Sequence, residues 1–349
     1  MIQQIAVSIA LALDIQCAGA ESQTYGPLCN GMDASGIIQK VIDTQPIVHF
    51  PTCNGCIQIN AAALQFSVDH RPVTLEGEGW SSAGAQPLGG TGWNCTDVKG
   101  TVLQITGQSD GIDFSAPNYN QNIVIKNLAI LGPGTGQSIG INFGTSSAAY
   151  IHLDNVLVAN FSTCYLMNNT LSSAFYDIHA SGCGTGVSLT GADSDLNFYR
   201  VDAEGNGVGF NVGAGSGIRL YGGLLQANQI GLKIAPTAFA ATALTFDGLW
   251  TEANSVNSIL IDTTLQPVTG LTIANSRCSD SGSSVIVLQG GKTIALTHLH
   301  DLYCAGASVM LPAYMNHAHI EDVDLAALID NSSCATLINT PLANKLGNC

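Results

Sequence analysis

Two short motifs place acidic side chains at alternate positions of an extended segment. Asp202 and Glu204 are two residues apart, and Trp250 stands two residues before Glu252. Because alternate side chains of a strand point to the same face, each motif puts both of its side chains on one surface. Paired carboxylates act as acid and base in glycoside hydrolysis, and an indole ring stacks on the C–H face of a sugar. The spacing therefore predicts a carbohydrate-binding surface with groups for acid–base chemistry.

The motifs belong to a repeat that is marked by its turns. Short apolar segments end at a polar or glycine turn, and successive turns are 22 to 27 residues apart. A repeat of this length with strands and no helix is typical of a solenoid whose coils bury their apolar faces by stacking. Asn and Gly suit a left-handed corner, and stacked asparagines can bond to the next coil. The turn residues are Asn160, Gly182, Asn206, Asn228, Asn254 and Ser281. The repeat predicts a β-helix, with a β-sandwich of unevenly spaced strands as the alternative.

Strand alternation predicts which side chains point outward. If the chain bends at Asp247 and Gly248, the segment before Asn254 buries its apolar residues and exposes Trp250 and Glu252. Stacking of the coils in register, roughly 4.8 Å apart, then gives two outward columns. The Glu204 column is Glu204, Gln226, Glu252 and Ser279, and the Trp250 column is Asp202, Leu224, Trp250 and Arg277. Residues placed just before the bend, which extend the face sideways, are Arg200, Asp247, Tyr199 and Tyr221. The same register is expected to point Asp177 and His179 inward or edgewise.

Two carboxylate pairs on this surface fit a glycosidase. Glu204 and Glu252 are two coils apart, which implies about 9.6 Å between their backbones, near the upper end of the ~6.5 to 9.5 Å carboxyl separation of inverting enzymes. Asp202 and Glu204 form a second pair at about 6.7 Å. We expect Glu204 and Glu252 to be acid and base, assisted by Asp202. Substrate contacts are expected from Trp250, Gln226, Arg200, Arg277, Asp247 and Tyr221.

The charge balance limits the partners of the protein. The 349 residues include 10 basic and 25 acidic side chains, which give a net charge of -15. Such a protein repels phosphate backbones and anionic membranes, so nucleic acid is not an expected partner. No metal or cofactor is expected either, because Cys53-x-x-Cys56 has no second cysteine pair and the paired histidines His298 and His300 lack a clear third ligand.

The N-terminus and the cysteines favour export. Residues 1–20 contain an apolar run and end in Ala18-Gly19-Ala20, which is typical of a signal peptide, although an N-terminal cap of the fold is the alternative. The run is too short to span a bilayer. Removing residues 1–20 leaves ten of the 11 cysteines, an even number that suits disulfides of unassigned connectivity. We expect one β-helix domain over residues 21–349, with caps at about 21–70 and 331–349 and coils at about 71–330.

Two regions carry a resemblance to a known family. A short helix is expected in "DASGIIQKVIDT", residues 33–44, and it precedes a Phe-Pro step and the strand "VTLEGEG" at residues 73–79. With the coil series, these regions cover most of residues 33–330 and resemble the right-handed parallel β-helix proteins of the pectate-lyase-like superfamily, which include phage tailspikes and polysaccharide-degrading enzymes. The resemblance implies an all-β, right-handed parallel β-helix with a short N-terminal capping helix. Superfamily members include lyases, hydrolases, epimerases and non-catalytic binders, so the resemblance carries little information about activity. A calcium-dependent pectate lyase is not favoured, because no calcium-binding aspartate cluster is found.

Together these features predict an extracellular or virion-exposed protein that binds a polysaccharide along its flank and cleaves it. Hydrolysis is the leading reaction, and a lyase is the second, in which Arg200 or Arg277 would neutralise the carboxylate of a uronate. The alternative is a non-catalytic spike, adhesin or structural surface protein. In that case Trp250 would contact another subunit of a homotrimer, the arrangement in which tailspike-like β-helices pack.

Overall fold

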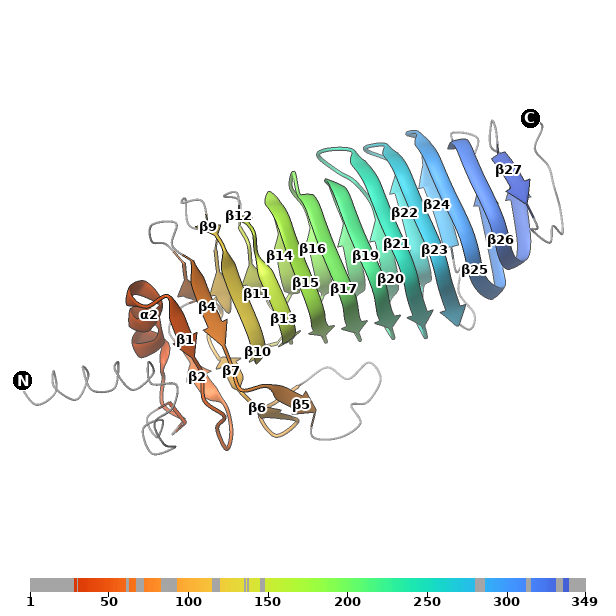
Figure 1. Ribbon diagram of the computed structural model, residues 1–349. Helices are drawn as coiled ribbons and strands as arrows, with labels where there is room; N and C mark the ends of the chain where they lie inside the picture. Colours follow the sequence, from red (N-terminus) through yellow and green to blue (C-terminus); the bar gives the residue numbers. More distant parts are fainter. Residues whose placement is uncertain are drawn as a thin grey trace, which may run out of the picture.

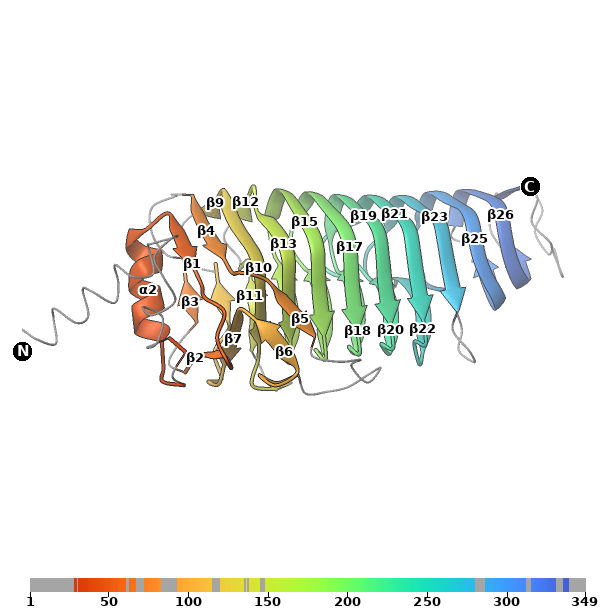
Figure 2. The same ribbon diagram turned by 60° about the horizontal axis from the view of Figure 1, so that its bottom comes forward.

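The described part of the protein is a stack of short strands that runs along one axis from an N-terminal helix. The computed structural model describes residues 28–29, 31–60, 63–66, 72–82, 93–114, 120–134, 136, 138–144, 148–279, 286–311, 315–330 and 335–338. The helix, α2 (Ser35–Thr44), packs at the end of the stack as the sequence predicts (Figures 1 and 2). In these residues, no helix has the length and apolarity needed to cross a membrane.

Two sheets made of parallel strands form the sides of the stack. The coils of residues 152–290 each add one long strand to a 16-stranded sheet, the larger sheet, and one short strand to a nine-stranded sheet. The larger sheet consists of β1 (Ile47–His49), β2 (Ile57–Ile59), β4 (Val73–Glu76), β7 (Val102–Ile105), β9 (Asn120–Gln121), β10 (Ile123–Leu131), β12 (Ala148–Ala149), β13 (His152–Ala159), β15 (Thr170–Ser181), β17 (Ser194–Glu204), β19 (Gly215–Gln226), β21 (Ala241–Glu252), β23 (Val268–Ser279), β25 (Ile294–Leu311), β26 (Met315–Asp330) and β27 (Ala335–Ile338).

The second sheet and one hairpin-like pair complete the strands. The second sheet consists of β3 (Leu64–Gln65), β8 (Ile112–Asp113), β11 (Ile139–Asn142), β14 (Thr163–Met167), β16 (Thr185–Leu189), β18 (Val208–Val212), β20 (Ile230–Ile234), β22 (Asn257–Thr263) and β24 (Ile286–Gly290). The strands β5 (Trp80–Ser82) and β6 (Val98–Gly100) pair antiparallel outside both sheets. This arrangement confirms the predicted right-handed parallel β-helix.

Each long strand of the larger sheet bends near its middle at a left-handed residue. The φ angle is 48° at Asp177, 58° at Arg200, 64° at Gly222 and 72° at Gly248. Gly248 confirms the bend that the sequence predicted there. Arg200 lies at the bend itself and not just before it. Because the bend residue interrupts strict alternation, the side chains after it take a new register.

The core contains the side chains that alternation assigned to the interior. Leu244, Phe246, Leu249 and Thr251 are all buried. Equivalent phenylalanines of adjacent coils stack, as Phe175 and Phe198 do with ring centroids 4.6 Å apart. The core is therefore built by stacking one coil on the next, as a solenoid requires.

Buried asparagines connect the coils at one corner. Asn206 Nδ2 donates to Asn228 Oδ1 at 3.1 Å, and Asn228 Nδ2 donates to Asn254 Oδ1 at 3.2 Å. Gly209 packs closely against this asparagine ladder: a Cβ atom added to Gly209 would lie 2.9 Å from Asn228 Nδ2. The ladder confirms that stacked asparagines bond to adjacent coils.

The left-handed corner residue differs from the sequence prediction in three coils. Asn160 and Gly182 are left-handed as expected, with φ of 64° and 63°. In the next three coils the left-handed residue is the one before the asparagine: Gly205, Ala227 and Ala253, with φ of 67°, 53° and 55°. The asparagines themselves turn inward because their side chains replace backbone hydrogen bonds that the corner cannot make. Ser281 lies outside the described residues.

Four disulfides join neighbouring segments. They are Cys29–Cys53, Cys56–Cys95, Cys164–Cys183 and Cys278–Cys304. Cys53 and Cys56 bond to different partners, so the Cys-x-x-Cys motif is neither a redox pair nor half of a zinc site. The prediction of structural bridges is confirmed, and Cys17, Cys334 and Cys349 lie outside the described residues.

One buried carboxyl makes the stability of the stack depend on pH. Asp193 is 1% exposed and accepts hydrogen bonds from the backbone N–H groups of Thr170 and Gly191. Burial raises its pKa from 3.8 to about 6, and these backbone hydrogen bonds only partly oppose the change. Because the folded-state pKa is the higher one, the contribution of Asp193 to stability is fully present below pH 3.8 and is lost as pH rises through about 6.

We expect Asp193→Asn to remove this pH dependence. The free energy of unfolding of the wild type, minus that of the variant, should fall by up to about 3 kcal/mol between pH 4 and pH 7. Urea denaturation at several pH values measures this difference. Asp195→Asn removes an exposed carboxyl two residues away and should leave the wild-type slope in place. A constant difference for Asp193→Asn would contradict the assignment.

Candidate functional site

The two predicted columns exist on the outer face of the larger sheet. Glu204, Gln226, Glu252 and Ser279 are Cα partners on consecutive coils. Asp202, Leu224, Trp250 and Arg277 are partners in the same way. Parallel pairing without a register shift keeps equivalent residues in line, which is why the repeat alone predicted the columns.

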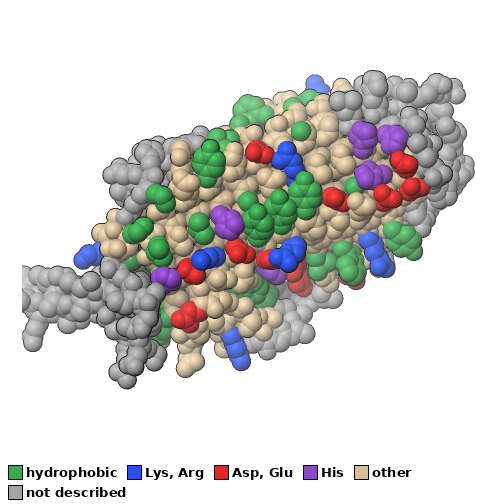
Figure 3. Space-filling view, viewed as in Figure 1, with side chains coloured by type: hydrophobic (Ala, Val, Ile, Leu, Met, Phe, Trp, Pro, Cys, Tyr) green, Lys and Arg blue, Asp and Glu red, His purple; other side chains and the backbone are tan. Residues whose placement is uncertain are grey.

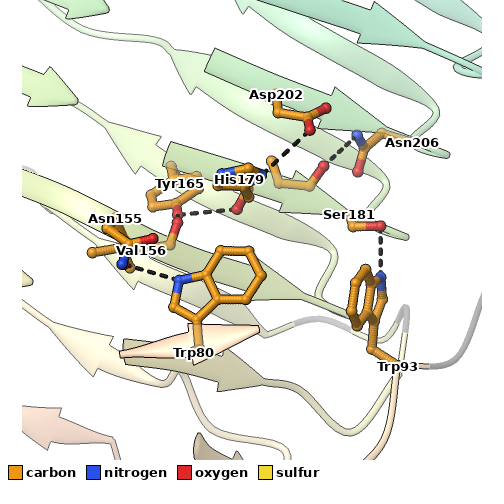
Figure 4. Close-up of polar contacts among 10 residues, drawn as sticks. Trp80, Trp93, Asn155, Val156, Tyr165, His179, Ser181, Asp202 and Asn206 are labelled. Atoms are coloured by element: carbon orange, nitrogen blue, oxygen red, sulfur yellow. Dashed lines mark hydrogen bonds and ion pairs between the residues drawn. The ribbon is translucent and has the colours of Figure 1, made fainter. Parts of the chain in front are cut away.

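A histidine extends the Trp250 column by one coil toward the N-terminus. His179 on β15 is the Cα partner of Asp202 on β17, and its Nδ1 lies 3.3 Å from Asp202 Oδ2 (Figure 4). The prediction that His179 points inward or edgewise is wrong. The left-handed bend at Asp177 restarts the alternation, so Ile178 and Ala180 are buried in the core while His179 is half-buried on the outer face.

Asp177 also lies on this outer face, where it forms an ion pair with Arg200 of the next coil. This pairing places the guanidinium of Arg200, a predicted substrate contact, at the bend beside the columns. The charge of Arg200 is therefore neutralised by Asp177 within the protein.

His179, Asp202 and Glu204 form the His179 cluster, and two tryptophans from an early segment of the chain border it. Trp80 lies edge-on to the His179 ring, with centroids 4.9 Å apart, and its Nε1 donates to the backbone oxygen of Asn155. Trp93 is buried, and its Nε1 donates to Ser181 Oγ at 2.7 Å (Figure 4). Figure 2 shows β5 and β6 lying outside the stack, alongside the long strands of the middle coils. Trp80 and Trp93 therefore cover one side of the cluster with aromatic rings.

Sequence reasoning missed Trp80 and Trp93. Trp93 and Ser181 are 88 residues apart along the chain, and the segment that carries the tryptophans does not share the repeat. The sequence offered one signal, two tryptophans at positions 80 and 93 in a segment without the repeat, but this signal did not specify which residues they contact.

Glu204 occupies an unusual electrostatic position in the cluster. Burial of its carboxyl raises its pKa, the charge of Asp202 raises it further, and His179 lowers it in part. Asp202 sits two residues earlier on the same face, and its Oδ1 is buried without a hydrogen-bond partner among the described residues. The environment therefore keeps the proton on Glu204 to a higher pH than on an ordinary glutamate, which suits a general acid.

Trp250 and Arg277 lie two and three coils from Asp202, toward the C-terminal end of the stack. Trp250 is 45% exposed, and its Nε1 donates to Ser279 Oγ at 2.9 Å. The guanidinium carbon of Arg277 is 5.5 Å from the centroid of the Trp250 ring. Glu252 stands beside Trp250 on the same strand, so the predicted neighbours are assembled as one surface.

The other predicted contacts lie on the opposite side of the bend. Tyr176, Tyr199 and Tyr221 form a stacked ladder, with ring centroids 4.8 Å and 5.4 Å apart. Asp247 is the Cα partner of Tyr221 and accepts a hydrogen bond from Asn275 Nδ2 at 2.7 Å. Figure 3 shows a patch of hydrophobic-coloured side chains, a class that includes tyrosine, near the middle of this face with charged groups around it. The face thus combines aromatic and ionic groups on both sides of the bend.

The donor groups of the described residues do not form a metal centre. No group of three or more His, Cys, Asp or Glu side chains in this part of the chain is placed to hold a metal ion.

No family model matches the sequence, and no curated protein matches it. Among solved structures, the A-module of mannuronan C-5 epimerase AlgE4 from Azotobacter vinelandii aligns with a TM-score of 0.55 and 13% identity, over 91% of this chain and 96% of that chain. The AlgE6 A-module from the same organism aligns with a TM-score of 0.53 and 12% identity, over 90% and 96%.

A viral protein aligns equally well. ORF18 of Geobacillus virus E2 has a TM-score of 0.53 and 11% identity, over 97% of this chain and 63% of that chain. At these identities the likeness concerns the fold. The chain therefore shares the parallel β-helix fold with these structures.

Proposed function

We propose that the protein is a carbohydrate-active enzyme that binds a polysaccharide along the larger sheet and cleaves it beside Glu204. The observation that carries the proposal is the raised pKa of Glu204, which lies on one strand face with Asp202 and next to His179. Solved structures with the same fold include mannuronan C-5 epimerases, which supports a carbohydrate substrate by analogy of fold.

In the hydrolytic reaction Glu204 is the general acid. Its carboxylic acid gives a proton to the glycosidic oxygen while the bond from that oxygen to the anomeric carbon breaks. A carboxylate takes a proton from the attacking water, whose oxygen bonds to the anomeric carbon. Asp202 and Glu252 are the two candidates for this base, at backbone separations from Glu204 of about 6.7 Å and 9.6 Å, and both distances leave room for a water.

The tryptophan wall supports the same location for the reaction. Trp80 and Trp93 cover one side of the cluster with apolar rings, which excludes water there and strengthens the interaction between the charges. Trp80 also packs against His179 and limits the positions that the imidazole ring can take. Trp250, Gln226, Arg277, Tyr221 and Asp247 would contact the sugar chain on either side of the cleaved bond.

The His179–Asp202 pair favours β-elimination as a second candidate reaction. Asp202 next to Nδ1 would hold the proton there and leave Nε2 free to act as a base. In a lyase, this base removes a proton from the carbon next to the uronate carboxyl, and Glu204 protonates the departing oxygen. The sugar then gains a double bond, and no water is consumed.

A panel of polysaccharides, assayed for both binding and products, tests the function. New reducing ends without unsaturated sugars indicate hydrolysis, and new reducing ends with an unsaturated uronate, which absorbs ultraviolet light, indicate elimination. A changed uronate configuration in an uncut chain, detected by NMR, would indicate epimerisation. Binding without any product would overturn the enzyme proposal and favour a spike, an adhesin or a structural surface protein.

Substitution of the two candidate bases distinguishes their roles. We expect Asp202→Asn to lower kcat by about a hundredfold or more, because it removes the carboxylate nearest to Glu204 and the partner of His179. Glu252→Gln should raise KM and change kcat by less than about tenfold, because Glu252 lies two coils away. Initial rates of reducing-end release at several substrate concentrations give both constants. If Glu252→Gln shows the larger fall in kcat, Glu252 is the base.

The disulfides favour a location outside a reducing cytoplasm. Such bonds persist in secreted proteins and on virion surfaces, and the four bonds among the described residues are distributed along the stack. We therefore propose that the protein acts outside the cell or on a virion. A homotrimer stays a prediction, which light scattering tests.

A further inference from the structure

Arg277 lies between two exposed aromatic rings on the outer face of the larger sheet. Trp250, Arg277 and Tyr303 are Cα partners on β21, β23 and β25. The guanidinium carbon is 5.5 Å from the centroid of the Trp250 ring and 5.8 Å from that of Tyr303. The two rings are 45% and 52% exposed, so this aromatic clamp stands in solvent.

The other cations of this face are neutralised by carboxylates. Lys126 pairs with Glu76, Arg200 with Asp177, and Arg219 with Asp195. Within the part of the chain that the structure describes, no carboxylate lies within ion-pair distance of Arg277. In a protein with 25 acidic and 10 basic side chains, an arginine without such a partner is conspicuous.

The clamp prepares the guanidinium for an anion. Cation–π contact with a ring on each side limits the motion of the guanidinium, whose planar group of N–H donors has no carboxylate partner among the described residues. This group presents a fork that matches two oxygens of a carboxylate or sulfate. Because the rings also displace water, the bond to an anion is stronger than it would be at a freely solvated arginine.

We propose that Arg277 binds an anionic group of the polysaccharide, a carboxylate or a sulfate carried by one sugar residue. This inference rests on the proposed function, because it places the anionic sugar on the same track as the catalytic cluster. Arg277 is three coils from Asp202 in the Trp250 column, about 14 Å along the stack, which is a distance that a bound chain of several sugars spans.

The net charge of -15 makes such a site selective. A long polyanion is repelled by most of this protein, so it gains affinity only where a local cation offsets the repulsion. The clamp therefore selects for an anionic group at one position of the chain, while the aromatic rings contribute stacking that does not depend on charge.

The test measures binding of three oligosaccharides by calorimetry, in a Glu204→Gln background in which cleavage is slow. The probes are an oligogalacturonate, the same compound after reduction of its carboxyl groups to alcohols, and a sulfated carrageenan oligosaccharide of equal length. We expect at least one anionic probe to bind at least tenfold more tightly than the reduced probe, and the preference between carboxylate and sulfate identifies the group.

Variants then assign the preference to Arg277. Arg277→Gln should remove it, and Arg277→Lys should retain only part of it, because an ammonium group has the charge without the fork. Arg219→Gln is the matched control: it also removes one exposed cation from the larger sheet, but one that is paired with Asp195, and it should leave the preference unchanged. Circular dichroism confirms that each variant is folded.

Equal binding of anionic and reduced probes, no binding of either anionic probe, or an unchanged preference in Arg277→Gln would overturn the inference. The results that would overturn the proposed function are different from those that would overturn this inference. Cleavage of a neutral polysaccharide that does not depend on Arg277 would leave the enzyme proposal standing without the anionic site. Binding through Arg277 with no cleavage of any polysaccharide would leave the site standing without the enzyme.

Discussion

Glu204→Gln is expected to lower the rate of polysaccharide cleavage by at least about a hundredfold and to change KM by only a few-fold. The amide has the size of the acid but has no acidic proton to give to the glycosidic oxygen. Since burial and Asp202 raise the pKa of Glu204, the wild type keeps this proton to a higher pH than an ordinary glutamate would. The alkaline limb of the wild-type pH–kcat profile should therefore follow the deprotonation of Glu204.

The pH profile separates a catalytic role from a structural one. In Glu204→Gln, the residual activity should no longer decline along that alkaline limb. Glu78→Gln is a suitable control, because Glu78 is exposed and accepts a hydrogen bond from the backbone of Thr52, away from the cluster. Turnover of Glu204→Gln within a few-fold of the wild type would remove Glu204 from the mechanism.

Asn228→Ala is expected to destabilise its part of the stack by about 3 kcal/mol. The buried amide of Asn228 donates to Asn254 Oδ1 and to the backbone oxygen of Ala203, and it accepts from the N–H and Nδ2 groups of Asn206. Alanine removes these bonds and leaves buried donors and acceptors of two adjacent coils without partners, which costs more than the bonds themselves contribute.

Hydrogen exchange measures this effect at a single position. The backbone N–H of Asn206, which donates to Asn228 Oδ1 at 2.9 Å, should exchange about a hundredfold faster in the variant. Asn211→Ala provides the comparison, because Asn211 is half-buried and makes a side-chain bond to Ser188 on the adjacent coil. Its effect on stability should stay within about 1 kcal/mol. Equal effects of the two substitutions would show that the ladder contributes no more than a surface bond.

The repeat made the fold and the two columns predictable from sequence. In-register stacking converts a spacing of 22 to 27 residues into a fixed direction across the coils, so Glu204, Gln226 and Glu252 could be aligned without coordinates. Alternation likewise identified the buried faces of β17 and β21. Both inferences depend on local backbone geometry that recurs from coil to coil, and such geometry is carried by the residues within each coil.

The exact position of each bend could not be read from the sequence. His179 was placed on the wrong face because Asp177 is left-handed, and aspartate adopts that conformation only when its surroundings stabilise it. The corner asparagines illustrate the same point. Alanines at positions 227 and 253 accept the left-handed backbone because the buried asparagine that follows each of them bonds to the preceding coil.

The sequence by itself determined the coil, its inward and outward faces, and the carboxylates that share a column. Only the tertiary structure brought His179 to Asp202, Trp80 and Trp93 to the same cluster, and Tyr303 to Arg277. The columns follow from a short repeat that acts between adjacent coils. The tryptophans come from a segment outside the repeat, and their contacts join residues 75 and 88 positions apart, a pairing that depends on how the whole chain packs.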